Sequence, residues 1–306
     1  MANHLVKDRT DGNEGMLRTA ALTALALVAF AANSLLGRLA LGAAQIDPAS
    51  YTSVRLLSGA MTLWAIVALS ARRNRTAHPR AWVSAAMLFF YAISFSFAYL
   101  SLDAGIGALI LFGAVQITMI LVGISEGKHP SALEWLGLLM AFGGLIYLVS
   151  PGLSAPAPLG SLLMFIAGVA WGLYTLRGRG VGDPVVGTAT NFALAVPLAL
   201  LVSLASMTGL DVTARGAWLA VLSGAVASGM GYVIWYAALK GLTTTRAAIV
   251  QLSVPVLAAI GGVVFLGEAM TLRLWLASAA ILGGVALAIL GKDTSRRVSE
   301  RRAIRR

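Results

Sequence analysis

EWLGLLMAFGGLIYL (residues 134–148) begins with a glutamate and carries no other charge. A similar stretch, LWLASAAILGGVALA (residues 274–288), follows 140 residues later. The two stretches share a tryptophan and a pair of glycines, at Trp135 and Trp275 and at Gly143-Gly144 and Gly283-Gly284. Apolar runs of this kind are typical of helices that span a membrane. The match therefore predicts two related spans, one late in each half of the chain.

The composition places the whole chain in a membrane. Of the 306 residues, 58% are hydrophobic and only 11% are charged, whereas a soluble protein has about 25% charged residues. In a soluble protein the net charge of +11 would suggest a nucleic-acid partner. Here the basic residues lie between apolar runs and in the C-terminal tail, so they indicate membrane topology and no nucleic-acid partner. The chain has no cysteine, which excludes disulfides and thiolate metal sites.

Ten apolar runs of roughly 20 residues predict an all-α integral membrane protein with ten transmembrane helices. The predicted spans are 17–41, 50–71, 81–101, 104–124, 131–150, 158–177, 186–207, 215–238, 245–266 and 272–291. We expect a first five-helix repeat over 17–150, a periplasmic linker at 151–160 and a second five-helix repeat over 161–291. Residues 1–16 and 292–306 are the expected cytoplasmic tails.

Basic residues predict the orientation of these spans. Most of the 23 Lys and Arg residues fall on the side that holds both termini, and the exceptions are Arg38, Arg55, Arg215 and Arg273. Positive residues mark the cytoplasmic side, so we expect both termini in the cytoplasm and the protein in a bacterial inner membrane. The first apolar run ends in LGAA, as a signal peptide could. It is long for a signal peptide, however, and it takes part in the internal repeat.

Further matches extend the repeat to the start of each half, where AFAANSLLGR (residues 29–38) aligns with AGVAWGLYTL (residues 167–176). The alignment places Asn33 on Trp171, Asp47-Pro48 on Asp183-Pro184, and Arg55 on Asn191. Each half has an odd number of spans, so the two halves cross the membrane in opposite senses. Such an inverted repeat is typical of secondary transporters, which bind substrate in a cavity between the halves.

Four sequence features together form one pattern. They are the starts of helices 1 and 6, the Asp-Pro pair before Arg55, Gly267-Glu268 after Pro255, and the paired glycines of helices 5 and 10. In this pattern the chain resembles the drug/metabolite transporter superfamily, in its EamA-type branch of ten-helix exporters. Its aromatic third helix looks most like the YddG-type amino acid exporters. The resemblance implies efflux of small metabolites through a central cavity, lined mainly by helices 1, 3, 4, 6, 8 and 9. The first half departs from the pattern, with Val115 in the place of Pro255 and Ser125-Glu126 in the place of the Gly-Glu pair.

Aromatic side chains on three predicted helices are candidates for a substrate-binding wall. In helix 3, Tyr91, Phe95 and Tyr99 recur every four residues and therefore share one face. The other aromatic candidates are Trp171 in helix 6 and Tyr232 and Trp235 in helix 8, and Met230 in helix 8 is a further apolar candidate. Packing between helices is the alternative for each ring, and for Tyr99 so is the aromatic belt at the membrane surface.

Polar residues inside the spans are further candidates, because a polar group in hydrocarbon needs a partner. We expect Asn33, Gln116 and Gln251 to contact substrate or a neighbouring helix. Pro255 removes one backbone hydrogen bond and leaves the carbonyl of Gln251 free for a substrate ammonium. A bend that only shapes the packing remains the alternative.

Four residues are expected to act on structure or conformation, namely Arg55, Pro255, Gly229 and Gly231. The two glycines allow close approach of another helix or a flexible bend. The long side chain of Arg55 could anchor helix 2 at the outer surface. It could instead pair with a substrate carboxylate.

The predicted function is transport and not catalysis. All acidic residues lie outside the middle of the spans, so a proton relay or sodium site has no mid-membrane carboxylate. No residues form a recognisable catalytic or metal centre, and we expect no cofactor. A neutral aromatic cavity suits small zwitterionic metabolites, and we expect export of amino acids, including aromatic or apolar ones. Alternating access would move them, by uncoupled facilitated diffusion or by exchange.

Two other functions stay open at this point. Efflux of lipophilic cations or drugs is the first, because aromatic rings also attract cations. A channel is the second, although it would not require the inverted repeat. In the lipid bilayer we expect a monomer or a homodimer.

Overall fold

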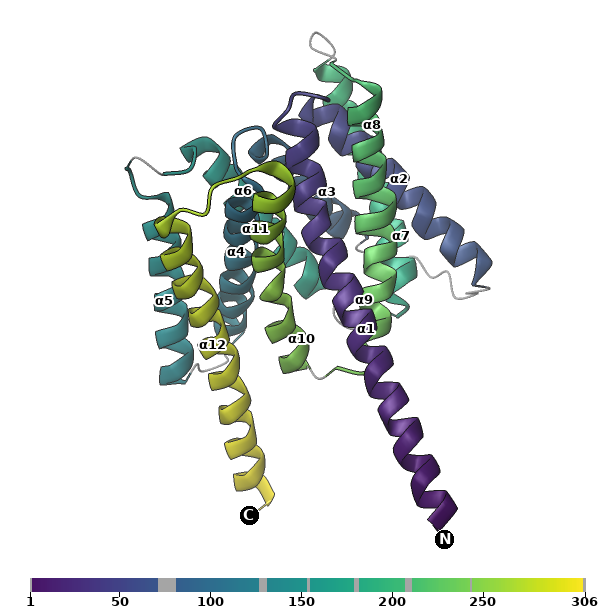
Figure 1. Ribbon diagram of the computed structural model, residues 1–306, viewed down its shortest axis with the longest axis vertical. Helices are drawn as coiled ribbons and strands as arrows, with labels where there is room; N and C mark the ends of the chain where they lie inside the picture. The colour runs from purple at the N-terminus through teal and green to yellow at the C-terminus, as the bar shows by residue number, and fades with distance from the viewer. Residues whose placement is uncertain are drawn as a thin grey trace.

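The computed structural model describes residues 2–70, 81–126, 131–152, 155–178, 182–206, 211–242 and 244–304, with side chains throughout except at 2–14, 244–245 and 292–304. The described chain is a bundle of helices (Figure 1). Their bounds are α1 Ala2–Leu41, α2 Pro48–Leu69, α3 Ala81–Ala98, α4 Ala104–Ser125, α5 Ala132–Val149, α6 Pro158–Arg177, α7 Pro184–Ala205, α8 Ala214–Val221, η2 Leu222–Met230, α9 Gly231–Leu239, α10 Thr244–Gln251, α11 Ser253–Leu266 and α12 Leu272–Ile304.

The predicted all-α fold with ten membrane-spanning helices is confirmed. In the described part of the chain, ten stretches are long and apolar enough to cross a membrane. Large apolar side chains such as Leu57, Phe90 and Leu201 are exposed on the outside of the bundle, where lipid would cover them. The protein is therefore a multi-pass membrane protein.

Both termini lie at the same end of the bundle, at the bottom of Figure 1. We call this end the termini face and the other end the opposite face. The expected tails continue the terminal helices, because α1 starts at Ala2, ahead of its span Gly15–Leu41, and α12 runs beyond its span Leu272–Gly291. The basic residues Arg72, Arg73, Arg75, Arg80, Lys128 and Arg179, which contribute to the predicted orientation, lie outside the described residues.

The two halves of the chain make equivalent contacts. Helix α2 packs on its counterpart α7, and α5 packs on its counterpart α12. Helix α3 of the first half packs on α6 of the second half. Their counterparts, the η2–α9 segment of the second half and α1 of the first half, also pack on each other. Likewise α4 packs on α6, and α11 packs on α1. Exchange of the halves leaves this contact pattern unchanged, as an inverted repeat requires.

The repeated Asp-Pro pairs begin the same helix in each half. The Asp47 side chain accepts a hydrogen bond from the backbone N–H of Ser50 at 2.9 Å, and the Asp183 side chain accepts one from Val185 at 2.9 Å. The prolines that follow are the first residues of α2 and α7. An acidic N-cap followed by proline is a strong helix start, so this sequence repeat has a direct structural meaning.

Two spans are interrupted near the middle of the second half. The eighth span passes from α8 through the π-helical segment η2 into α9. The ninth span is divided at Leu252 into α10 and α11, three residues before Pro255. A proline near the start of a helix removes a hydrogen bond from the preceding turn, which explains the division at this position.

Glycines of the eighth span lie against the first half. A Cβ atom at Gly229 would meet Thr62 of α2 at 3.2 Å, and one at Gly231 would meet Ala29 of α1 at 3.2 Å. At Gly224 a Cβ would collide with the backbone oxygen of Arg55. These glycines thus bring η2 and α9 close to α1 and α2.

The contact between α5 and α12 tests the packing of the repeat. A Cβ at Gly137 would collide with the backbone of Gly284 and Ala288, whereas a Cβ at Gly143 meets nothing within 4 Å. We expect Gly137→Ala to lower the stability by about 1–3 kcal/mol, because overpacking forces the helices apart. Gly143→Ala is the matched control and should leave the melting temperature of the purified protein unchanged or slightly raised. Equal melting temperatures of the two variants would contradict this packing.

Candidate functional site

A cavity of about 360 Å³ lies between the two halves. Its mouth is formed by Ala81 at the start of α3, Arg177 at the end of α6 and Asp183 at the start of α7. These helix ends belong to the termini face. The cavity reaches inward to Asn33 on α1 and Arg55 on α2. Arg55 is seven residues from the start of α2 at the opposite face, a distance of about 10 Å along the helix.

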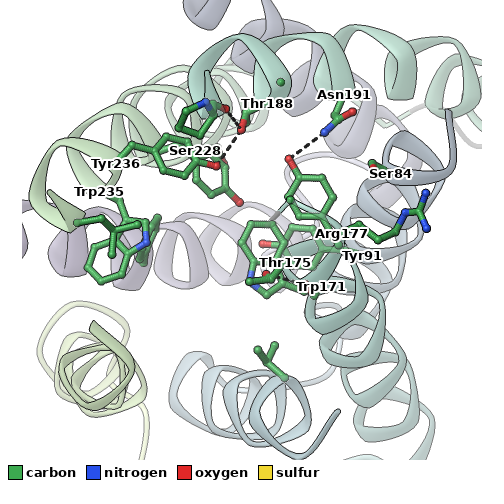
Figure 2. Close-up of a pocket in the computed structure, with 18 of the residues that line it drawn as sticks. Ser84, Tyr91, Trp171, Thr175, Arg177, Thr188, Asn191, Ser228, Trp235 and Tyr236 are labelled. Carbon is green, nitrogen blue, oxygen red and sulfur yellow. Dashed lines mark hydrogen bonds between the residues drawn. The ribbon is translucent and has the colours of Figure 1, made fainter. Parts of the chain in front are cut away.

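Aromatic rings form one continuous side of the cavity, which we call the aromatic wall. It consists of Trp171, Tyr174, Tyr232, Trp235 and Tyr236. The rings of Trp171 and Tyr232 stack with centroids 5.5 Å apart and an interplanar angle of 24°, and Tyr232 stacks on Tyr236 at 6.2 Å. Figure 2 shows an open space between Trp171 and the Trp235–Tyr236 pair. Such a surface favours an apolar or aromatic ligand.

Polar groups line the side of the cavity formed by α7. Thr188 shares a hydrogen bond of 2.9 Å with the Tyr236 hydroxyl (Figure 2). The side-chain amide of Asn191 donates to the Tyr174 hydroxyl at 3.4 Å. These bonds fix the two tyrosine rings of the aromatic wall and leave polar atoms beside the open space.

The inner end of the cavity holds a polar cluster of Asn33, Arg55, Tyr91 and Ser223. Arg55 Nη2 donates to the Tyr91 hydroxyl at 2.8 Å, and Asn33 Nδ2 donates to the same oxygen at 3.4 Å. Ser223 in η2 donates to Asn33 Oδ1 at 2.6 Å. The cluster therefore joins α1, α2 and α3 of the first half to η2 of the second half.

The opposite face is closed by contacts between the halves. Glu268, between α11 and α12, accepts the backbone N–H of Ala104 at 2.8 Å and pairs with Arg38 Nε at 3.5 Å. Arg38 Nη2 also pairs with Asp103 at 3.4 Å. A second closure joins the α1–α2 loop to the segment before α8, where Thr213 N–H donates to the backbone oxygen of Gln45 at 2.9 Å. The cavity is thus open on the termini face and shut on the opposite face.

The second half of the chain carries a family signature. Residues 158–290 match the EamA-like transporter family. The Pseudomonas aeruginosa protein PA1977 is 52% identical over 270 residues, which cover 88% of this chain and 94% of that protein. The chain belongs to the EamA-like transporter family.

More distant relatives agree with this assignment. The transporter YwfM of Bacillus subtilis is 25% identical over 263 residues, covering 82% of this chain and 85% of YwfM. The inner membrane transporter YedA of Escherichia coli K12 is 26% identical over 205 residues, covering 63% of this chain and 64% of YedA. A crystal structure with 22% identity superposes with a TM-score of 0.62 over 87% of this chain and 96% of that chain, which shows a shared fold.

The structure brings half of the candidate residues of the EamA-like chain to the cavity. Asn33, Arg55, Tyr91, Trp171, Tyr232, Trp235 and Gln251 line it. Their role in substrate binding stays a prediction. Arg55 does not reach the membrane surface as an anchor would, because its side chain turns toward Tyr91 and the residue is only 2% exposed.

The other candidates lie outside the cavity lining. Phe95 and Tyr99 are fully buried, so the surface-belt interpretation of Tyr99 is wrong. Gln116 on α4 is buried, with its side-chain nitrogen unpaired among the described residues. Met230 is 45% exposed on the outside of the bundle. Pro255, Gly229 and Gly231 serve helix geometry and packing, as described above.

Several residues that line the cavity were not among the candidates predicted from the sequence. Phe30, Tyr174 and Tyr236 each lie three or four residues from a predicted site residue on the same helix, so helical spacing could have identified them. Thr188 and Asn191 were also not among the candidates, because they come from α7, a helix that the family resemblance does not imply as a main contributor. The packing of α7 against α2 and α3 brings Thr188 and Asn191 to the cavity. Hydropathy carries no information about which helices pack together.

Trp171 connects the polar cluster to the aromatic wall, since its ring lies 4.6 Å from Tyr91 and 5.5 Å from Tyr232 between centroids. We expect Trp171→Ala to lower transport at least tenfold while the protein remains folded, because the substrate loses its central ring contact. The matched control is Trp275→Ala on α12, where the ring is 59% exposed and faces away from the cavity. Uptake into proteoliposomes, with size-exclusion chromatography as the folding check, measures both. Normal transport by the Trp171→Ala variant would show that the Trp171 ring does not contribute to the substrate site.

Glu268 makes the closure of the opposite face sensitive to pH. Burial raises the pKa of the Glu268 carboxyl, although the Ala104 N–H and the Arg38 guanidinium oppose this shift. A raised pKa in the folded state means that folding favours the protonated form, so this stabilisation is lost as pH rises through the folded pKa. We expect the melting temperature of wild type, relative to that of Glu268→Gln, to fall as the pH rises above the ordinary pKa of a glutamate, about 4. A difference that stays constant as the pH rises would contradict the expected shift.

Proposed function

We propose that this protein exports small zwitterionic metabolites, above all amino acids with apolar or aromatic side chains, across the bacterial inner membrane. The observation that carries the proposal is the aromatic cavity of about 360 Å³ between the two halves, open on the termini face. Its volume lies within the range of pockets for small organic ligands. The name of the YedA relative supports the inner membrane as the location.

The direction of transport follows from the predicted orientation. Basic residues favour cytoplasmic termini, and the cavity opens on the face where the termini lie. A cavity on this side loads substrate from the cytoplasm, as export requires. The second state of the cycle would open the Arg38–Glu268 closure and shut the mouth, in keeping with alternating access between inverted halves.

The lining favours exchange or facilitated diffusion over coupling to a proton or sodium gradient. Among the described lining residues, the one carboxylate is Asp183 at the mouth, where it caps α7. Coupling sites for cations in transporters commonly use carboxylates within the membrane. The proposed cycle therefore needs only the substrate gradient.

Lipophilic cations are the alternative substrates, since the aromatic wall would also attract a positive charge. The guanidinium of Arg55 at the inner end of the cavity argues against them. A zwitterion tolerates both features, because its ammonium can face the rings while its carboxylate faces the arginine.

Counterflow in proteoliposomes tests the proposal. Vesicles are loaded with unlabelled phenylalanine, leucine, a sugar phosphate or a quaternary ammonium compound, and uptake of radiolabelled phenylalanine is followed at symmetric pH and sodium. We expect saturable counterflow with the two amino acids alone. Counterflow driven only by the quaternary cation, measured with labelled cation, would overturn the amino acid assignment. Transport that needs an imposed ion gradient would overturn the uncoupled cycle.

A further inference from the structure

The Arg55 side chain is a cation enclosed in protein, with no counter-ion in the part of the chain that the structure describes. The residue is 2% exposed. Among the described residues the ion pairs are Arg38–Asp103 and Arg38–Glu268, and neither includes Arg55. Its guanidinium instead lies over the rings of Tyr91 and Phe95, at 5.2 Å and 4.6 Å from their centroids. Ring faces offset only part of the cost of burying a charge.

The hydrogen-bonding capacity of Arg55 is also largely unused. Of its donor nitrogens, Nη2 bonds to Tyr91, while Nε and Nη1 are buried with no partner in the described structure. Buried donors are almost always paired in proteins, and an unpaired donor on a charged group is especially costly. Such a group at the edge of a cavity is a site for an acceptor that arrives with a ligand.

Tyr91 supplies a second donor at the same place. Its oxygen already accepts hydrogen bonds from Arg55 and from Asn33. With its oxygen occupied in this way, the hydroxyl hydrogen is free to donate, and no acceptor for it is found in the part of the chain that the structure describes. The ring of Tyr91 lines the cavity, so the hydroxyl is positioned for a ligand acceptor.

The surrounding residues keep the donors in this arrangement. Ser223 donates to Asn33 Oδ1 at 2.6 Å, which turns the Asn33 amide nitrogen toward Tyr91. The inner end of the cavity therefore holds the Arg55 guanidinium and the Tyr91 hydroxyl in a fixed arrangement.

We propose that the buried guanidinium of Arg55 and the hydroxyl of Tyr91 form a carboxylate-binding subsite at the inner end of the cavity. A carboxylate has two acceptor oxygens and a negative charge, and an arginine fork binds both together. The subsite rests on the proposed function, which it deepens by fixing how the substrate is oriented. The carboxylate enters first and the apolar side chain lies against the aromatic wall. Substrates that lack the carboxylate leave the Arg55 charge unpaired and bind weakly.

A series of related compounds tests this subsite on the unmodified protein. The compounds are phenylalanine, phenylalaninamide, 2-phenylethylamine and 3-phenylpropanoate, each used to compete with labelled phenylalanine in counterflow. We expect the amide and the amine to compete about tenfold to a hundredfold less well than phenylalanine, because each lacks the anionic group. Equal competition by phenylalanine and its amide would overturn the subsite.

Variants assign this preference to the two residues. The quantity compared is the preference ratio, which is how much better phenylalanine competes in counterflow than phenylalaninamide. Arg55→Gln should reduce this ratio at least tenfold, and Arg55→Lys should keep part of it. Tyr91→Phe, which retains the ring, should also reduce the ratio. Arg215→Gln, which removes an exposed arginine of α8, is the matched control and should leave the ratio at its wild-type value. An unchanged ratio in a folded Arg55→Gln protein would overturn the proposal, since a purely structural arginine would alter stability and not this preference.

The outcomes separate the subsite from the proposed function. If wild type exchanges phenylalanine and its amide equally, amino acid transport stands and the subsite falls. If 3-phenylpropanoate is exchanged and amino acids are not, the subsite stands and amino acid export falls. If only a quaternary cation is exchanged, both fall.

Discussion

The buried positive charge of Arg55 is the constraint on which the arrangement of the cavity depends. Taking a guanidinium out of water inside a membrane protein is costly, and this one has no carboxylate partner among the described residues. The neighbouring helices are arranged to accommodate it. Helix α3 presents the ring faces of Tyr91 and Phe95 to the guanidinium, and η2 packs against the α2 backbone at Gly224. In the proposed subsite, this arrangement leaves Nε and Nη1 of Arg55 available to a negatively charged group.

The inverted repeat explains why such a site lies between the halves. Each half alone leaves its α1–α3 or α6–α9 surface uncovered, and the contacts α3–α6 and α1–α9 cover these surfaces reciprocally. The cavity lies within this shared interface, so a movement of one half against the other changes its access. In the present state the Arg38–Glu268 contact and the Gln45–Thr213 bond shut the opposite face. A substrate that neutralises Arg55 would remove an electrostatic cost in whichever state binds it, which gives the substrate a direct influence on the cycle.

Much of the fold could be predicted from the sequence, because the membrane fixes the length and polarity of its spans. The two Asp-Pro pairs were predicted to occupy equivalent positions in the repeat, and each of them does begin a helix with an aspartate cap. The division of the ninth span follows from Pro255, a local effect of the backbone. The π-helical segment η2 was not predicted, because its widened turn depends on packing against α2 and α1 and not on a local sequence signal.

The cavity could be predicted only in part. Helical spacing placed Trp171, Tyr232 and Trp235 on faces that do reach the cavity. The same spacing gave Tyr91, Phe95 and Tyr99 one face, yet Phe95 and Tyr99 lie behind the lining. The depth of each residue along α3 decides this difference, because the cavity extends from Ala81 at the mouth to Tyr91, and Phe95 and Tyr99 lie further toward the closed opposite face. The contact between Arg55 and Tyr91 joins residues 36 positions apart on two helices, and no local pattern contains it.

A structure of the protein with phenylalanine bound tests the central claim most directly. The account predicts the amino acid between the two halves, with its carboxylate within hydrogen-bonding distance, about 3 Å, of Arg55 and the Tyr91 hydroxyl. Its ring should lie against Trp171 and Tyr232. A bound amino acid whose carboxylate faces the mouth, with Arg55 still unpaired, would contradict the account.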